Sequence, residues 1–78
     1  MHSLPQLLGA NICALRLQKN LLQDGLALLC GLDRSYMGRI ERGEVNITVE
    51  TLYQIAEALG CEPAPVLPLK NEVISSKS

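Results

Sequence analysis

The chain has 78 residues and a formal net charge of −1, which is enough for one small domain but gives no overall attraction to nucleic acid. Hydrophobic residues make up 47% of it, yet it contains no Phe or Trp and two Tyr. The core must therefore be aliphatic, which favours helices over strands. The shortage of aromatic rings argues against single-stranded nucleic-acid binding by base stacking.

Several other classes of protein are also disfavoured. Cys13, Cys30 and Cys61 lack CxxC spacing, and with the single His2 they form no metal motif, so we expect reduced thiols and no cofactor. The N-terminal segment has no basic region before an apolar run, and no apolar run is long enough to cross a bilayer. We find no catalytic motif and no phosphate-binding glycine loop, so we expect neither an enzyme nor a small-molecule substrate.

The first helix is predicted from Leu8, Ile12 and Leu15, which recur at helical spacing. It is expected to end near Lys19 or Asn20. The predicted domain spans residues 6–69, with tails at residues 1–5 and 70–78.

The second helix is predicted to begin near Gln23, but its cap is missing because Leu22 has no side-chain acceptor. Asn20, three residues before Gln23, is expected to cap it instead. Gly25 inside this helix should cost about 0.5–1 kcal/mol relative to alanine. Gly31 fits the turn that follows, where a positive φ is needed.

The third helix carries stronger local signals. Asp33 is a good N-cap, Leu32 and Met37 stand at the positions of a hydrophobic staple, and Gly43 fits the left-handed residue that ends the helix. Two short helices joined by a tight turn make a helix-turn-helix unit. The outward face of its second helix is then expected to contain Arg34, Ser35, Tyr36, Gly38 and Arg39.

A fourth helix is predicted after Thr48, which caps it, and before Gly60, which ends it. Its apolar stripe comprises Leu52, Ile55, Ala56 and Leu59. Pro63 could open a fifth helix of about one turn.

Charge is unevenly distributed. Residues 16–42 carry five positive and three negative side chains, a net charge of +2, whereas residues 43–69 carry four glutamates and a net charge of −4. Such a separation would orient a small domain on DNA, although it predicts weak binding by a monomer.

Four segments resemble the Xre family of phage-repressor-type helix-turn-helix regulators. They are LGANICALR, LALLCGL, DRSYMGRIERG and TLYQIAEALGCEP, and the resemblance runs from about residue 8 to residue 67. Within that family, DRSYMGRIERGEVNIT is most similar to the controller proteins of restriction–modification systems. The resemblance implies a compact all-α, four- to five-helix repressor-like domain that binds double-stranded DNA through the major groove.

The resemblance also implies roles for individual residues. Arg34 would read guanine through a bidentate hydrogen bond, and Arg39 would reach a base or a phosphate. Gln23, at a helix N-terminus, and Asn46, in a loop, would contact phosphates. For the two arginines, the alternative is an ordinary solvated helix face.

Three further assignments follow from the same resemblance. Ser35 and Tyr36 would contact base edges or phosphates, although Tyr36 could instead pack on the neighbouring helix. Arg16 and Glu41 would form a structural salt bridge between the first and third helices.

The function expected is a sequence-specific transcriptional regulator that binds an inverted repeat as a homodimer in a bacterial cytoplasm, encoded by the bacterium or a phage. The candidate dimer interface comprises Tyr53, Val66, Leu67 and Leu69, unless these side chains cover the core of their own chain. The alternative is a protein-interaction module that has lost DNA binding. Val45, in place of a polar loop residue, and an exposed Leu28 or Leu29 favour that alternative.

Overall fold

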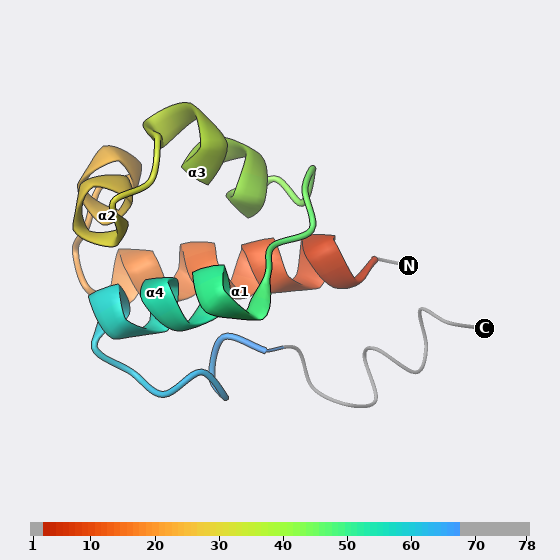
Figure 1. Cartoon of the computed structure of the whole chain (residues 1–78). Coiled ribbons are helices and arrows are strands. Elements are labelled where there is room, and N and C mark those ends of the chain that lie inside the picture. The colour runs from red at the N-terminus through yellow and green to blue at the C-terminus, as the bar shows by residue number, and fades with distance from the viewer. Residues whose placement is uncertain (1–2, 68–78) are drawn as a thin grey trace.

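The computed structural model describes residues 3–67, which form four α-helices and no strand (Figure 1). The helices are α1 (Leu4–Gln18), α2 (Gln23–Cys30), α3 (Arg34–Glu41) and α4 (Val49–Leu59). The predicted all-α fold with a helix-turn-helix is confirmed. No described helix is long and apolar enough to cross a membrane.

Helix α1 begins earlier than the predicted domain boundary at residue 6. Ser3 caps it: the Ser3 hydroxyl accepts from the backbone amide of Gln6 (3.4 Å), and the Gln6 side chain accepts from the Ser3 amide (3.0 Å). This reciprocal capping box, with Pro5 in the first turn, fixes the start of the helix.

Asn20 ends α1, so the prediction that it caps α2 is wrong. Its φ of 58° is in the left-handed region. The backbone amides of Asn20 and Leu21 donate back to the carbonyl groups of Leu17 (3.0 Å) and Arg16 (3.2 Å). This is a Schellman motif, whose left-handed position is usually occupied by glycine and sometimes by asparagine.

The other helix boundaries follow the local signals in the sequence. Leu22 stands at the N-cap of α2 without a side-chain hydrogen bond, whereas Asp33 accepts from two backbone amides at the start of α3. Thr48 accepts from the amide of Thr51 (3.1 Å) at the start of α4. The helices α2, α3 and α4 are followed by glycines with φ values of 70–75°, namely Gly31, Gly43 and Gly60.

The predicted fifth helix is absent from the described residues. Residues 63–67 form hydrogen-bonded turns, in which the amide of Val66 donates to the carbonyl of Pro63 (3.0 Å) and that of Leu67 to Ala64 (3.1 Å). Pro65 disfavours the helical conformation of the residue before it, which argues against a longer helix here.

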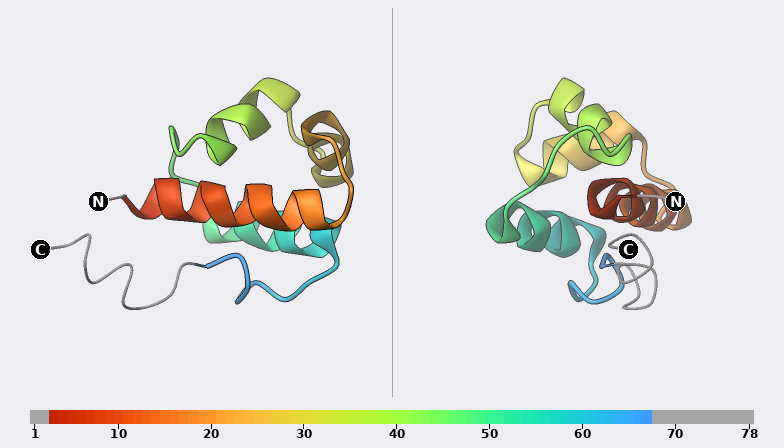
Figure 2. Two further views of the ribbon diagram at one scale, coloured as in Figure 1. Left: turned by 180° about the vertical axis from the view of Figure 1, so that it is seen from behind. Right: turned by 90° about the vertical axis from the view of Figure 1, so that its right-hand side faces the viewer.

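The core lies between α1, the α2–α3 pair and α4. Helix α1 packs against α3 and α4, while α2 packs against α3 and α4. Figure 2 shows α3 and residues 61–67 on opposite sides of α1. The largest side chains with almost no exposed surface are Ile12, Leu26, Met37, Ile40, Ile55, Leu59 and Val66.

The burial of Val66 corrects one predicted contact. Val66 is 0% exposed within the core of its own chain, and its carbonyl accepts from the side-chain amide of Asn11 (2.9 Å). A side chain buried in this way is not available for a dimer interface. Val66 instead covers the core of its own chain, which was the alternative to the interface prediction. Leu69 lies outside the described residues.

Candidate nucleic-acid interface

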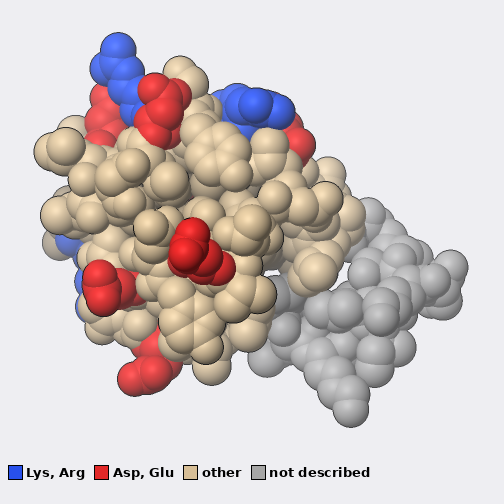
Figure 3. All heavy atoms as spheres, viewed as in Figure 1, with Lys and Arg blue, Asp and Glu red and all other residues tan. Residues whose placement is uncertain are grey.

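Helix α3 presents a polar, solvent-exposed face. The side chains of Arg34 and Arg39 are 75% and 54% exposed, and Ser35 is also exposed. Tyr36 is half-buried and packs against the core, as its alternative assignment allowed. Figure 3 shows basic side chains along the edge formed by α3, each beside an acidic one, whereas the charges over α4 are acidic.

Gly38 does not belong to this outward face and is buried, contrary to the prediction. A Cβ atom added there would lie 3.1 Å from Nη1 of Arg42 and 3.2 Å from Oε1 of Gln23. The absence of a side chain at residue 38 therefore makes room for the Gln23 side chain to lie across α3.

The predicted salt bridge between Arg16 and Glu41 is present and bidentate. Nε and Nη2 of Arg16 donate to Oε2 and Oε1 of Glu41 at 2.8 and 3.1 Å. The two side chains are 11% and 5% exposed. The hydrogen bond with Glu41 raises the pKa of Arg16, an effect opposed in part by burial.

Two further hydrogen bonds extend this pair into a network joining the first three helices. Nη1 of Arg16 donates to the carbonyl of Leu21 between α1 and α2 (2.8 Å), and Nε2 of Gln23 donates to Oε1 of Glu41 (3.1 Å). Sequence reasoning did not anticipate the Gln23–Glu41 bond. It orients the first residue of α2 relative to α3, and one N–H of the Gln23 amide remains for another acceptor.

Each exposed arginine on or beside α3 has an acidic neighbour. Arg34 lies 3.4 Å from Asp24 of α2, and both side chains are well solvated, so this pair is weak. Arg42, just beyond α3, forms a shorter contact: its Nε lies 2.7 Å from Oε2 of Glu44. Nε of Arg39 lies 3.9 Å from the other Glu44 oxygen.

Arg42 and Glu44 were not among the predicted site residues. Hydrogen bonding to Arg42 lowers the pKa of Glu44, and the same bond raises the pKa of Arg42. The sequence contained a signal, because the two residues flank Gly43, the predicted left-handed residue at which the chain reverses. Asn46, a predicted phosphate contact, is exposed in the following loop.

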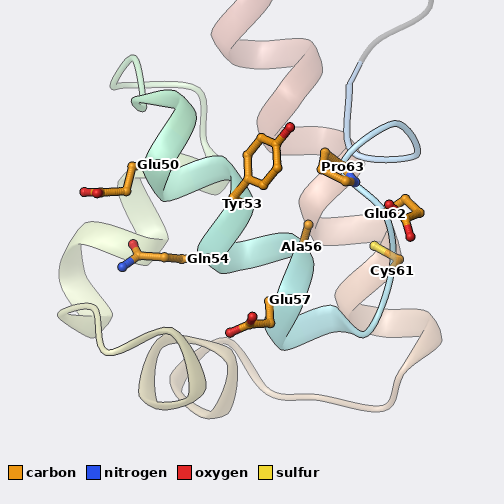
Figure 4. Close-up of a pocket in the computed structure, with 8 residues that line it drawn as sticks. All are labelled: Glu50, Tyr53, Gln54, Ala56, Glu57, Cys61, Glu62 and Pro63. Carbon is orange, nitrogen blue, oxygen red and sulfur yellow. The ribbon is translucent and has the colours of Figure 1, made fainter.

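The face that includes α4 differs in character. A groove of about 440 Å³ is lined by Tyr53 of α4 and by Pro63 in the segment that follows α4 (Figure 4). Three glutamates also line it: Glu50, Glu57 and Glu62. Tyr53 is 59% exposed and Leu67 46%, so both remain candidates for the dimer interface. Within residues 3–67, no three potential metal-ligating side chains come together.

Helix α2 exposes more apolar surface than predicted. One of Leu28 and Leu29 was expected to be exposed, but both are, at 82% and 60%. The buried side of α2 is already formed by Leu26, Ala27 and Cys30. Burial raises the pKa of the Cys30 thiol.

These features define a helix-turn-helix domain whose second helix offers a polar, arginine-containing face to solvent, the arrangement that DNA-reading domains use. Comparison with known proteins agrees: the sequence matches the helix-turn-helix family over residues 14–66. The chain belongs to this family.

Curated relatives include two control proteins. Control protein C.BamHI of Bacillus amyloliquefaciens is 39% identical over 62 residues, 78% of this chain and 76% of the relative. Control protein C.SmaI of Serratia marcescens is 40% identical over 70 residues, 86% of this chain and 83% of the relative.

Solved structures include restriction-modification controller proteins. That of C.AhdI from Aeromonas hydrophila superposes with a TM-score of 0.79 and is 40% identical, covering 81% of this chain and 96% of that one. A C.Esp1396I tetramer in complex with its natural 35 base-pair operator has a TM-score of 0.76 and is 28% identical, covering 96% and 95%. The resemblance to controller proteins found in the sequence is thereby confirmed.

Proposed function

We propose that this protein is a sequence-specific transcriptional regulator that places α3 in the major groove of operator DNA. The observation that carries the proposal is the exposed polar face of α3, held in place by the buried network of Arg16, Glu41 and Gln23. This network matters because it fixes the position of α3, and base-edge recognition needs side chains held in a fixed register on the duplex.

The roles of the individual side chains follow from their positions. Arg34, in the first turn of α3, is our candidate for bidentate recognition of guanine, with Ser35 beside it. Arg39, one turn further, is assigned to a base or a phosphate. Half-buried Tyr36 supports the helix with its ring and can offer its hydroxyl to the groove.

Gln23 and Asn46 are assigned to phosphates on either side of the groove. Gln23 begins α2, where Leu22 provides no side-chain acceptor, so the first backbone N–H groups of the helix are not capped by a side chain. Helix N-termini with such groups are favourable positions for a phosphate.

The regulator acts as a homodimer on an inverted repeat in the cytoplasm, where the DNA is. One recognition helix reads few base pairs, and a chain with a net charge of −1 has little general attraction to phosphates. A second copy doubles the number of base pairs read and the number of phosphate contacts, and it places the half-sites roughly 34–36 Å apart. The similarity to a controller that forms a tetramer on its operator supports assembly.

Tyr53 and Leu67 are the candidate contacts between the copies. Light scattering at tens of micromolar should give the mass of a dimer, and the double variant Tyr53→Ser, Leu67→Ser should shift it to that of a monomer. A wild-type monomer at this concentration would contradict the dimer.

DNase footprinting on the DNA flanking the gene for this protein tests the proposed function. We expect two protected half-sites related by a dyad, with an affinity whose logarithm falls steeply as the logarithm of the salt concentration rises. No protected site anywhere in this region, at low salt and micromolar protein, would contradict DNA regulation at its own gene.

One observation favours a second function, the binding of another protein through α2. The adjacent side chains of Leu28 and Leu29 form exposed apolar surface, which marks interaction sites more often than isolated leucines do. This second function is preferred if two results are obtained together. The protein fails to retard DNA, and a partner protein that co-purifies with wild type no longer co-purifies with the double variant Leu28→Ser, Leu29→Ser.

A further inference from the structure

The loop after α3 carries an acidic side chain on the face that would meet DNA. Glu44 accepts from Nε of Arg42 at 2.7 Å and from Nη2 at 3.5 Å, and its second oxygen lies 3.9 Å from Nε of Arg39. The three side chains are 48–59% exposed. One carboxylate thus neutralises part of the charge of two arginines that phosphates would otherwise attract.

The backbone of Glu44 is held by the fold. Its amide donates to the carbonyl of Arg39 (2.9 Å), and the amide of Gly43 donates to that of Ile40 (3.0 Å), which together make a Schellman motif. Gly43 has a φ of 75°, and a Cβ atom there would lie 2.6 Å from Cα of Gln6 in α1. The backbone of Glu44 is therefore fixed in a position that places its side chain beside Arg39 and Arg42.

We propose that Glu44 is a built-in competitor of DNA phosphate: in the free protein it binds Arg42 and lies beside Arg39, and so lowers the affinity for DNA of any sequence. A phosphate that takes over the Arg42 donors bound to Glu44 must displace the carboxylate, which also repels it. Charge at a DNA-binding surface acts mainly on the sequence-independent part of the affinity. The residue thereby limits the fraction of the protein held on non-operator DNA.

The size of the effect follows from counterion release. Each phosphate that a chain neutralises contributes about −0.9 to the slope of log affinity against log salt concentration. Releasing Arg42 from Glu44 should add about one such contact for each chain bound. At 50 mM salt, one added contact corresponds to an affinity about tenfold higher.

This inference rests on the proposed function, and its test compares two variants with equal net charge. Glu44→Gln removes the competing carboxylate but keeps the length of the side chain and the backbone hydrogen bond. Glu57→Gln removes an exposed carboxylate from α4, in the groove away from α3. Binding of each to a random-sequence duplex is measured by fluorescence anisotropy between 50 and 200 mM salt, with retention on a heparin column as a second polyanion probe.

For each chain bound, we expect Glu44→Gln to bind the random duplex about tenfold more tightly than wild type at 50 mM salt and to steepen the salt slope by about 0.9. It should also elute from heparin at higher salt, whereas Glu57→Gln should change all three readings less. Equal changes in the two variants, or none in Glu44→Gln, would overturn this inference while leaving DNA binding by wild type intact. If neither wild type nor Glu44→Gln binds any duplex, the proposed function and this inference both fail.

Discussion

The two helices of the helix-turn-helix have the same length of eight residues but are stabilised differently. Helix α3 has a cap in Asp33, whose carboxylate accepts from the amides of Ser35 and Tyr36 at 2.9 and 3.2 Å. Helix α2 has Leu22 at its cap position and Gly25 in its interior. Local interactions thus support the helix proposed to read DNA much more than its partner.

What α2 lacks locally, its neighbours supply. It buries Leu26, Ala27 and Cys30 against the core, and Gln23 is tied to Glu41 of α3. Helix α2 thus takes its position from α1 and α3, whereas the start of α3 is fixed by its own sequence.

The largest effect is expected from Glu41→Gln. It leaves the cation of Arg16 buried without its counter-charge and disturbs the acceptor of Gln23. Removing one partner of a buried pair typically costs 3–5 kcal/mol, so the free energy of unfolding should fall by about 3 kcal/mol in urea denaturation. Glu57→Gln, on exposed surface, is the control. Equal losses of unfolding free energy in the two variants would show that the network does not stabilise the fold.

Asp33→Ala should have the next largest effect, because it removes the acceptor for two backbone amides of α3. We expect a loss of about 1.5 kcal/mol in unfolding free energy. Asp33→Asn keeps an acceptor oxygen and should lose much less. If the asparagine variant is as unstable as the alanine variant, Asp33 does not act as a cap.

The opposite change in α2 is Leu22→Ser, which adds the missing acceptor. Leu22 is 78% exposed and has the extended backbone of an N-cap, so little packing is lost. The unfolding free energy should rise by about 1 kcal/mol. Leu22→Ala has no acceptor and serves as the control; a gain of the same size in that variant would rule out capping as the cause.

Gly25→Ala should give the smallest gain, about 0.5–1 kcal/mol from helix propensity, since a Cβ atom there meets nothing within 4 Å. Gly31→Ala also meets open space but sits at a φ of 70°, which strains any side chain. It should therefore destabilise the protein in the same denaturation experiment. Destabilisation by both variants would contradict the view of α2 as locally suboptimal.

The signals that predicted the fold correctly were local ones. Asp33, Thr48 and the three glycines after α2, α3 and α4 act on neighbours within a few residues, so their roles follow from spacing alone. The capping box of Ser3 and Gln6 was equally local but lay before the first predicted helical residue. Asn20 was assigned to the wrong helix because it fits both the end of one helix and the start of the next.

The features that sequence reasoning missed depend on how the helices pack. Gly38 is buried because the Gln23 side chain from another helix lies over it, and Val66 is buried because its turn closes the core beside α1. Periodicity within a single segment contains neither relation. The Arg16–Glu41 pair was implied by family resemblance, and the composition of the chain alone would not have selected it.

Arg34→Ala is the most direct test of α3 as the helix that reads base edges. Affinity is measured for the footprinted operator, for operators with each base pair changed in turn, and for a random duplex, with Lys19→Ala as a control for lost charge. We predict that Arg34→Ala loses about tenfold or more in operator affinity and no longer discriminates at one guanine position, while Lys19→Ala keeps the full sequence preference. An Arg34→Ala protein with the sequence preference of wild type would show that Arg34 does not read a base.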